Sequence, residues 1–392
     1  MNYLEENTMK LSELCTNGYA GKYYLPIRQI SLPLTNRCNS YCIMCHACSK
    51  DYNNHTYYND PPAEMSLESM RYFFPPQKYT LWDKFCKTQK QDNDPISFMF
   101  GTAETLLNSQ CYQIFQYIKS IYPNSKINLI SNGTIPPRPE DIVKYIDRIG
   151  FSVDGCTAET YEYLRTPCKF EHTMKTIRQW DEAAAKYNKN FSFGFGTVVS
   201  AKNIHELPGI VELASSYEHI DSVYLQPIVL HESLLHLAPL LLTTLDSNEA
   251  EQCLEEAKAV SKRTGVRIDG IDSITSILRR TNISSKECPT DAANSKYCRY
   301  MWNGMVSFRN DRTLRYLCCY MDKEKCDELM DLYQLPVSGK IKNIYNSKKF
   351  WKLRKDMLDG KLTAYCEGCS LCNAGYENLK ASEVNMDEYF YL

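Results

Sequence analysis

The 392-residue sequence has no long apolar run and no excess of charge of one sign. No segment reaches the roughly 18 apolar residues that can span a bilayer, and residues 1–15 lack the apolar centre of a secretion signal. The 45 basic and 47 acidic residues are intermixed and leave a formal net charge of -2, so no basic surface for nucleic acid or an anionic membrane is expected. We expect a cytoplasmic protein with small or peptidic partners, and no nucleic-acid or membrane partner.

Cysteine, in contrast, is abundant, with 18 residues. In a reducing compartment, clustered thiols more often bind metal or carry out redox chemistry than form disulfides. Many of these cysteines fall into two groups, one near the start and one near the end of the chain: Cys38, Cys42, Cys45 and Cys48, and then Cys288, Cys298, Cys318, Cys319, Cys366, Cys369 and Cys372. Each group indicates a separate site.

Between the two groups, short β-rich runs alternate with helical patterns. The expected strands are 28–35, 95–101, 126–133, 148–155, 191–200 and 221–230. The expected helices are 66–74, 109–122, 138–148, 171–187 and 204–217, with a further helix from about Asp246. Six strands separated by five helices predict repeated βα units and a parallel sheet with right-handed crossovers.

The unusual residues of this region follow the strands. The first strand leads into the cysteine loop, and later strands lead into "GTAET" (101–105), "SNG" (131–133), "SVDG" (152–155) and "SAKN" (200–203). Because α/β sheets carry their chemistry at the carboxyl ends of the strands, we expect these segments to form one site. Asn132, and Gln226 in the sixth strand, are included in it as cofactor-binding residues.

The C-x3-C-x2-C spacing of Cys38, Cys42 and Cys45 resembles the signature of the radical S-adenosylmethionine (SAM) superfamily. Three thiolates can bind three irons of a [4Fe–4S] cluster and leave the fourth iron open to an outside ligand. The resemblance implies that SAM binds there, and that an electron, supplied by an external donor such as flavodoxin or ferredoxin, releases a 5'-deoxyadenosyl radical. The alternative is a zinc site completed by Cys48 or His46.

Two further segments resemble the SAM-binding segments of this family. "GTAET" is similar to the family's Gly-Gly-Glu-Pro segment, which implies that Gly101 and Glu104 meet the SAM amino group. Its second and last residues, both threonine, depart from that pattern. "SVDG" followed by "ETYEYLR" implies that Ser152 and Arg165 hold the SAM carboxylate, a group that the guanidinium fork suits. The resemblance also places Asn203 in the site, and the backbone of Met44 against adenine.

The C-terminal cysteines resemble those of the SPASM extension, or its shorter twitch form, which binds an auxiliary [4Fe–4S] cluster. The implied ligands are Cys298, Cys318, Cys366 and Cys369, with Cys319 and Cys372 as alternatives of register. A structural zinc ribbon would use similar spacing. The basic run "KKFWKLRK" (348–355) predicts a solvated helix face with Phe350, Trp351 and Leu353 partly packed.

Together these patterns predict an α/β protein with a partial (β/α)6 barrel and a small cysteine-rich domain. The expected divisions are a lead-in (1–27), a radical SAM core (28–230), a connecting helical segment (231–287) and a SPASM/twitch-like domain (288–392). The short lead-in implies no fused reader of a leader peptide.

The resemblance implies a radical SAM enzyme of the oxidoreductase or maturase type that abstracts hydrogen from a peptide or a small molecule such as a sugar. The auxiliary cluster would then accept an electron. One alternative is a redox-neutral epimerase, for which Cys168 is a candidate hydrogen donor. The other is a non-catalytic, zinc-stabilised binding protein.

Overall fold

The computed structural model describes the central part of the chain and several short segments outside it. These are residues 8–9, 15–16, 19–20, 29–45, 64–74, 96–101, 103–230, 232–280, 305–308, 314–315, 348–358 and 384–385. The cysteines of the predicted auxiliary site, together with Cys48 and His46, lie outside the described residues. Within the described part of the chain, no helix has both the length and the apolar composition needed to cross a membrane.

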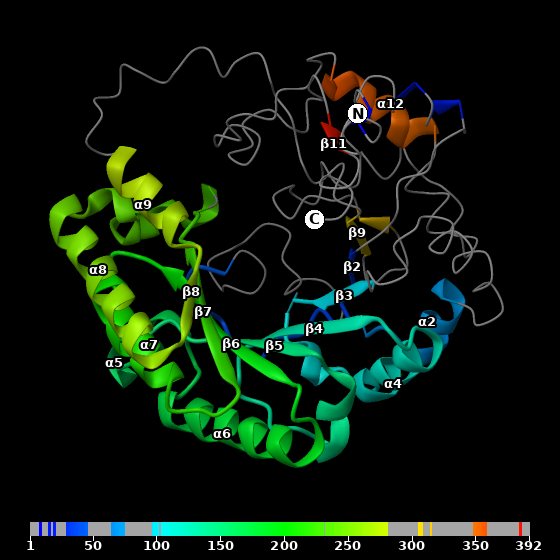
Figure 1. Ribbon diagram of the computed structural model, residues 1–392, viewed down its shortest axis with the longest axis horizontal. Coiled ribbons are helices and arrows are strands. Elements are labelled where there is room, and N and C mark those ends of the chain that lie inside the picture. The colour runs from blue at the N-terminus through cyan, green and yellow to red at the C-terminus, as the bar shows by residue number, and fades with distance from the viewer. Residues whose placement is uncertain are drawn as a thin grey trace, which may run out of the picture.

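The main feature of the fold is a curved nine-stranded sheet (Figure 1), in the order β10-β9-β2-β3-β4-β5-β6-β7-β8. Neighbouring strands are parallel, except that β9 and β10 are antiparallel. The strands are β2 (Gln29–Ser31), β3 (Ser97–Phe100), β4 (Lys126–Ser131), β5 (Arg148–Ser152), β6 (Ser192–Val199), β7 (Ile220–Pro227), β8 (Arg267–Asp269), β9 (Met305–Phe308) and β10 (Leu314–Arg315). A separate two-stranded pair joins β1 (Thr8–Met9) to β11 (Val384–Asn385).

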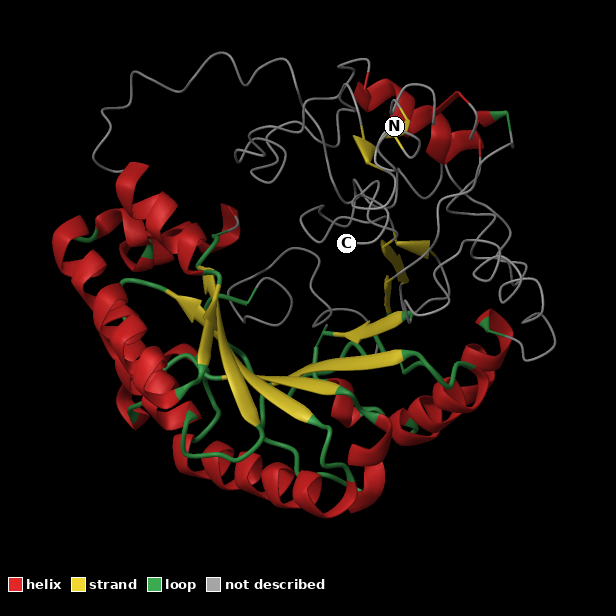
Figure 2. Cartoon of the chain, in the orientation of Figure 1, coloured by secondary structure: helices red, strands yellow, loops and turns green. Residues whose placement is uncertain are grey.

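The helices that connect these strands cover the convex side of the sheet, which does not close (Figure 2). They include α2 (Leu67–Phe73), α4 (Cys111–Ile121), α5 (Ala158–Leu164), α6 (Phe170–Tyr187), α7 (Leu207–Ala214), α8 (Ser247–Thr264) and α9 (Ile271–Arg280). Short 3-10 helices add η2 (Thr105–Leu107), η3 (Glu140–Tyr145), η4 (Ile204–Glu206), η5 (Glu232–Leu240) and η6 (Leu242–Thr244). The architecture is the predicted α/β partial barrel.

All six predicted strands are present as β2 to β7, and the order and parallel direction are as predicted. The sheet continues past residue 230, because β8 pairs with β7 beyond the helix predicted to start at about Asp246. The Asp246 side chain caps that helix by accepting hydrogen bonds from the backbone N–H groups of Asn248 and Glu249.

One expectation about helices is wrong, and a second is incomplete. The helix predicted over 138–148 is only the 3-10 helix η3, because Pro139 precedes it and the backbone is already extended at Ile146 on the way into β5. In α12 (Lys348–Leu358), the basic run is not simply a solvated face. Arg354 is fully buried, and its guanidinium carbon lies 4.6 Å from the ring centre of Trp351, which is itself buried.

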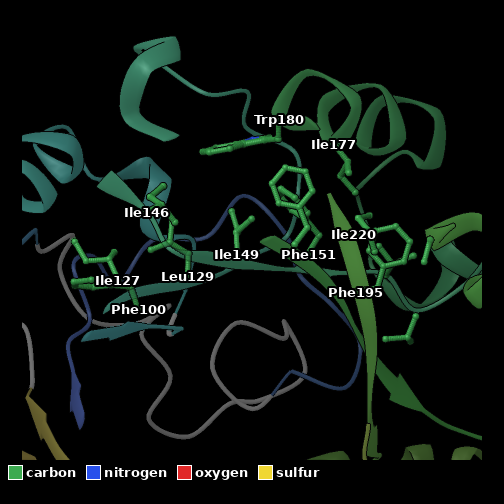
Figure 3. Packing of buried hydrophobic residues seen from close by; sticks show 14 of the residues in the cluster. Phe100, Ile127, Leu129, Ile146, Ile149, Phe151, Ile177, Trp180, Phe195 and Ile220 are labelled. Atoms are coloured by element: carbon green, nitrogen blue, oxygen red, sulfur yellow. The ribbon is translucent and has the colours of Figure 1, made fainter. Parts of the chain in front are cut away.

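The main core lies between the sheet and its covering helices (Figure 3). Alternate strand residues such as Ile149 and Phe151 face the helices and are fully buried. Trp180 of α6 packs against Phe151 with ring centres 6.1 Å apart, and its indole N–H donates to the Ile135 carbonyl at 2.8 Å. This alternation leaves the other side of each strand facing the concave side of the sheet.

Gly270 should be the least replaceable glycine at the edge of the sheet. Its φ is +85°, and an added Cβ would lie 2.1 Å from the Leu225 carbonyl oxygen of β7. Gly270→Ala should therefore lower the free energy of unfolding by about 3 kcal/mol or more, measured by urea titration. Gly265, with a φ of +81° and no atom within 4 Å of such a Cβ, is the control. Gly265→Ala should cost only about 1 kcal/mol, and equal costs would contradict the packing argument.

Candidate active site

The loop that follows β2 holds three thiols, those of Cys38, Cys42 and Cys45, at the carboxyl end of the sheet. Two backbone hydrogen bonds fasten it to the end of α5: Tyr41 N–H donates to the Thr166 carbonyl at 2.6 Å, and Ile43 N–H donates to the Leu164 carbonyl at 3.1 Å. A third bond joins it to the loop after β3, where Glu104 N–H donates to the Arg37 carbonyl at 2.9 Å. The thiols are therefore positioned by backbone contacts with two other loops.

The environment of Cys42 is apolar and almost closed to water. Cys42 and Met44 are buried together with Leu164 and Ile228. Burial raises the pKa of the Cys42 thiol to about 12, and the positive charge of the neighbouring Arg165 acts in the opposite direction. The Ser40 hydroxyl lies 2.9 Å from Cys42 Sγ.

Asn132, directly after β4, is brought to Cys38. Its Nδ2 donates to Cys38 Sγ at 3.8 Å and to Asn39 Oδ1 at 2.7 Å. Its Oδ1 accepts from the Thr134 backbone N–H at 3.0 Å and from the Thr134 hydroxyl at 2.7 Å. The side-chain amide is therefore held in one orientation, with its N–H groups toward the cysteine loop.

Glu104, in the loop after β3, is hydrogen-bonded to the backbone of Asn132 and is completely buried. Its carboxylate accepts hydrogen bonds from the backbone N–H groups of Asn132 (2.8 Å) and Leu106 (3.2 Å) and from the Ser131 hydroxyl (3.1 Å to each oxygen). Ala103, immediately before it, has a φ of +55°, a region that costs a residue with a Cβ roughly 1–2 kcal/mol. Glu104 therefore ties the loops after β3 and β4 together.

Glu104 should make the protein less stable as the pH rises toward neutrality. Burial raises its pKa from 4.5 to about 7, against the opposing effect of its hydrogen bonds. Folding therefore favours the protonated form. The stability associated with that form is fully present below the unfolded pKa of 4.5 and is lost as the pH rises through about 7, by at most about 3 kcal/mol. Glu104→Gln, which does not titrate, should flatten this part of the curve of unfolding free energy against pH.

Glu206 is the matched control, because it is also buried but has a pKa shifted in the other direction. Burial alone would raise its pKa, but hydrogen bonds from Thr160, from Thr157 and from the Cys156 backbone together lower it. Its stabilising contribution is present above its unfolded pKa and is lost as the pH falls. Glu206→Gln should therefore reduce the loss of stability in acid. If the two variants changed the pH profile in the same direction, the assignment to Glu104 would be wrong.

Arg165 and Asp154 form a buried ion pair at the carboxyl end of β5. Arg165 ends α5, and its Nη1 donates to Asp154 Oδ2 at 2.6 Å. The other carboxylate oxygen accepts the Val198 backbone N–H of β6 at 2.7 Å. Arg165 Nε is buried and has no hydrogen-bond partner in the described part of the chain. The guanidinium therefore retains a donor that an anionic ligand could use.

Asn203, after β6, is fully buried in the same network. Its Nδ2 donates to the carbonyls of Asp154 (2.9 Å) and Val198 (3.0 Å), and its Oδ1 accepts from the backbone N–H and hydroxyl of Ser200. These bonds connect the loop after β6 to the end of β5. The side-chain amide of Asn203 thus fixes the loop after β6 against Asp154.

Ser152 and Gln226 lie further along the concave side of the sheet. Ser152 pairs in register with Gly196, and Gly196 pairs with Tyr224, which is 54% exposed. A Cβ at Gly196 would meet nothing closer than 4.0 Å, so open space lies between the two side chains. Gln226 follows Tyr224 on the same side of β7 and is exposed. Gly101 is exposed at the end of β3.

The structure places Cys38, Glu104 and Asn132 in one set of hydrogen bonds and Arg165 and Asn203 in a second set around Asp154. Sequence reasoning missed the residues that hold them: Asp154, Ser131, Ser40, Asn39 and Thr134. The first two lie inside motifs that the sequence pattern did single out, "SVDG" and "SNG". The roles of Ser40, Asn39 and Thr134 left no signal in the sequence, because they depend on contacts between loops.

The residues fit a cluster of the predicted kind. Three thiols lie in one loop, and a nearby buried guanidinium has an unused donor for an anionic group. No three or more of the described His, Cys, Asp and Glu residues lie close enough to hold one metal ion. In a [4Fe–4S] cluster each cysteine binds a different iron, so the thiols do not need to converge on one point.

Comparison with solved structures identifies the type of fold. SuiB of Streptococcus suis, bound to its precursor peptide SuiA, is 10% identical, with 89% of this chain and 71% of that chain covered and a TM-score of 0.52. A histidine-tagged form of anSMEcpe with bound AdoMet is 17% identical, with 93% of this chain and 91% of that chain covered and a TM-score of 0.52. At these identities the similarity shows a shared partial-barrel α/β fold.

The sequence of the central region is similar to one known family. Residues 32–214 match the family model described as the Radical SAM superfamily. This match begins just before the cysteine loop and ends with α7. The comparison with curated protein sequences gave no match. Residues 32–214 are therefore similar to a radical SAM domain.

Proposed function

We propose that the protein is a radical SAM enzyme whose N-terminal [4Fe–4S] cluster is held by Cys38, Cys42 and Cys45. When bound, such a cluster supplies one electron for the reductive cleavage of SAM and leaves one iron to coordinate it. The observation that carries the proposal is the unused buried Nε of Arg165 close to a three-thiol loop at the carboxyl end of the sheet.

In this proposal the residues of the network have different tasks. Arg165 binds the SAM carboxylate directly, because Asp154 occupies only one of its donors. The cofactor site is lined by Ser152, Gln226, Gly101 and the backbone of Met44. Glu104, Asn132 and Asn203 were predicted to bind SAM, but their side chains make several hydrogen bonds within the chain and are almost fully buried. We assign them to the cofactor site chiefly as residues that position its walls.

The remaining parts of the proposal concern the substrate and the electrons. Hydrogen abstraction from a peptide or a small molecule is followed by oxidation, with an auxiliary [4Fe–4S] cluster at Cys298, Cys318, Cys366 and Cys369 as the electron acceptor. Flavodoxin or ferredoxin supplies the electron for SAM cleavage. The SuiB structure contains a precursor peptide, so short peptides are included among the substrates to be tried.

Anaerobic purification tests the proposal. The enzyme should contain about eight irons per chain, as two cubane clusters require, and should convert SAM to 5'-deoxyadenosine when reduced. Stoichiometric zinc without SAM cleavage would reject the enzyme in favour of a zinc-stabilised binding protein. Incubation with SAM in deuterated water separates the outcomes on substrate, because an epimerase takes up solvent deuterium at the modified carbon and an oxidase does not.

A further inference from the structure

Two side chains outside the cysteine triad lie within hydrogen-bonding distance of its sulfurs. We propose that Ser40 and Asn132 donate hydrogen bonds to the cluster-binding thiolates of Cys42 and Cys38, and that these bonds set the reduction potential of the N-terminal cluster. The inference rests on the proposed function and deepens it. It makes Ser40 and Asn132 positioning residues that control how readily the enzyme is reduced.

The contact of Ser40 has a defined direction once Cys42 is a metal ligand. The hydroxyl oxygen lies 2.9 Å from Cys42 Sγ, and both side chains are buried. A thiolate only accepts hydrogen bonds, so the hydroxyl must be the donor.

The orientation of Asn132 is fixed by its other partners. Thr134 presents two donors, its backbone N–H and its hydroxyl, to the same side-chain atom of Asn132 at 3.0 and 2.7 Å. That atom must therefore be the amide oxygen, since a flipped amide would place an NH2 group against a backbone N–H. The NH2 group is left facing Cys38 Sγ at 3.8 Å and Asn39 Oδ1 at 2.7 Å. The Glu104 carboxylate also accepts a hydrogen bond from the Asn132 backbone N–H at 2.8 Å.

Hydrogen bonds to sulfur influence the two redox states unequally. The added electron increases the negative charge on the cluster and its thiolates, so a donor stabilises the reduced state more than the oxidised one. Ser40, Asn132 and Cys42 are nearly inaccessible to solvent, whereas Cys38 is partly exposed, so water cannot readily replace the donor removed from Cys42. Loss of either donor should lower the reduction potential.

The test is a redox titration of the anaerobic full-length enzyme, followed by electron paramagnetic resonance. The signal that changes on adding SAM identifies the N-terminal cluster. Ser40→Ala and Asn132→Ala should each reduce the ratio of reduced to oxidised cluster about tenfold at a fixed potential, a shift of about 59 mV for one electron. Ser40→Thr, which keeps the hydroxyl, should retain the wild-type potential.

Ser125→Ala is the matched control. Ser125 is equally buried, and its hydroxyl donates to the Tyr122 carbonyl at 2.8 Å, but it lies just before β4 at the opposite end of the strands. The potential of this variant should not change. Unaltered potentials in Ser40→Ala and Asn132→Ala, with the cluster present, would overturn the inference. A wild-type protein without an N-terminal cluster would instead overturn the proposed function.

Discussion

Replacing Cys42 by alanine should abolish reductive cleavage of SAM. In the proposed function each thiolate of the triad binds one iron, so the variant would lack a ligand at a position that is buried and cannot readily be filled by water. Even partners outside the ligand shell typically cost about 10–100-fold on removal, so the rate of 5'-deoxyadenosine formation should fall by more than about 100-fold. Iron should fall from about eight to about four per chain, the number in one remaining cubane.

Cys111→Ala is the control for this experiment. Cys111 is a buried thiol at the start of α4 and part of the main hydrophobic core. Its loss should slightly lower stability and leave iron content and SAM cleavage intact. A Cys42→Ala protein with full iron content and activity would contradict the assignment of the ligands. Replacing all three triad cysteines tests independence, because about four irons should remain if the C-terminal site is a separate cluster.

The second large effect is expected from Asp154→Ala. This substitution leaves the Arg165 guanidinium as a buried charge without its carboxylate, and it removes the acceptor of the Val198 N–H. Removing one partner of a buried ion pair typically costs about 3–5 kcal/mol. The free energy of unfolding should fall by that amount in urea titrations. SAM should also bind more weakly, because Asp154 no longer orients Arg165.

Two further variants make this result interpretable. Asp154→Leu combined with Arg165→Met removes both charges and should recover part of the lost stability, although SAM binding should remain lost. Asp141→Ala breaks the exposed pair between Asp141 and Lys144, whose atoms are 2.6 Å apart, and should change stability little. If the buried and the exposed substitutions had equal effects, the buried pair would not be important for the site.

The sequence allowed the central sheet to be predicted because its strands are regular and strongly apolar on the helix-facing side. Segments such as 191–200 alternate buried phenylalanines with small residues, and each strand is followed by a polar motif. β8 was not predicted, since Arg267, Ile268 and Asp269 form only a three-residue edge strand. The pairing of β9 with β2 joins residues 276 positions apart, such as Gln29 and Met305, which no local pattern can indicate.

The positions of the candidate residues near the strand ends could be predicted, but their contacts could not. Glu104 and Asn203 were recognised from their motifs, but their complete burial depends on partners in neighbouring loops. Asp154 could have been suspected as a partner of Arg165. A buried guanidinium needs a counter-charge, and Asp154 is the acidic residue of the "SVDG" motif. The hydrogen bond of Ser40 depends on the path of the loop rather than on a pattern of residue types.

The fastening of the cysteine loop to Leu164 and Thr166 has a consequence for how the cofactor is installed. Small zinc domains gain their structure from the metal and unfold when a chelator removes it. Here two backbone hydrogen bonds fasten the cysteine loop to the end of α5. For the proposed enzyme we therefore expect that a protein whose cluster was lost to oxygen regains it on addition of iron and sulfide alone, without unfolding.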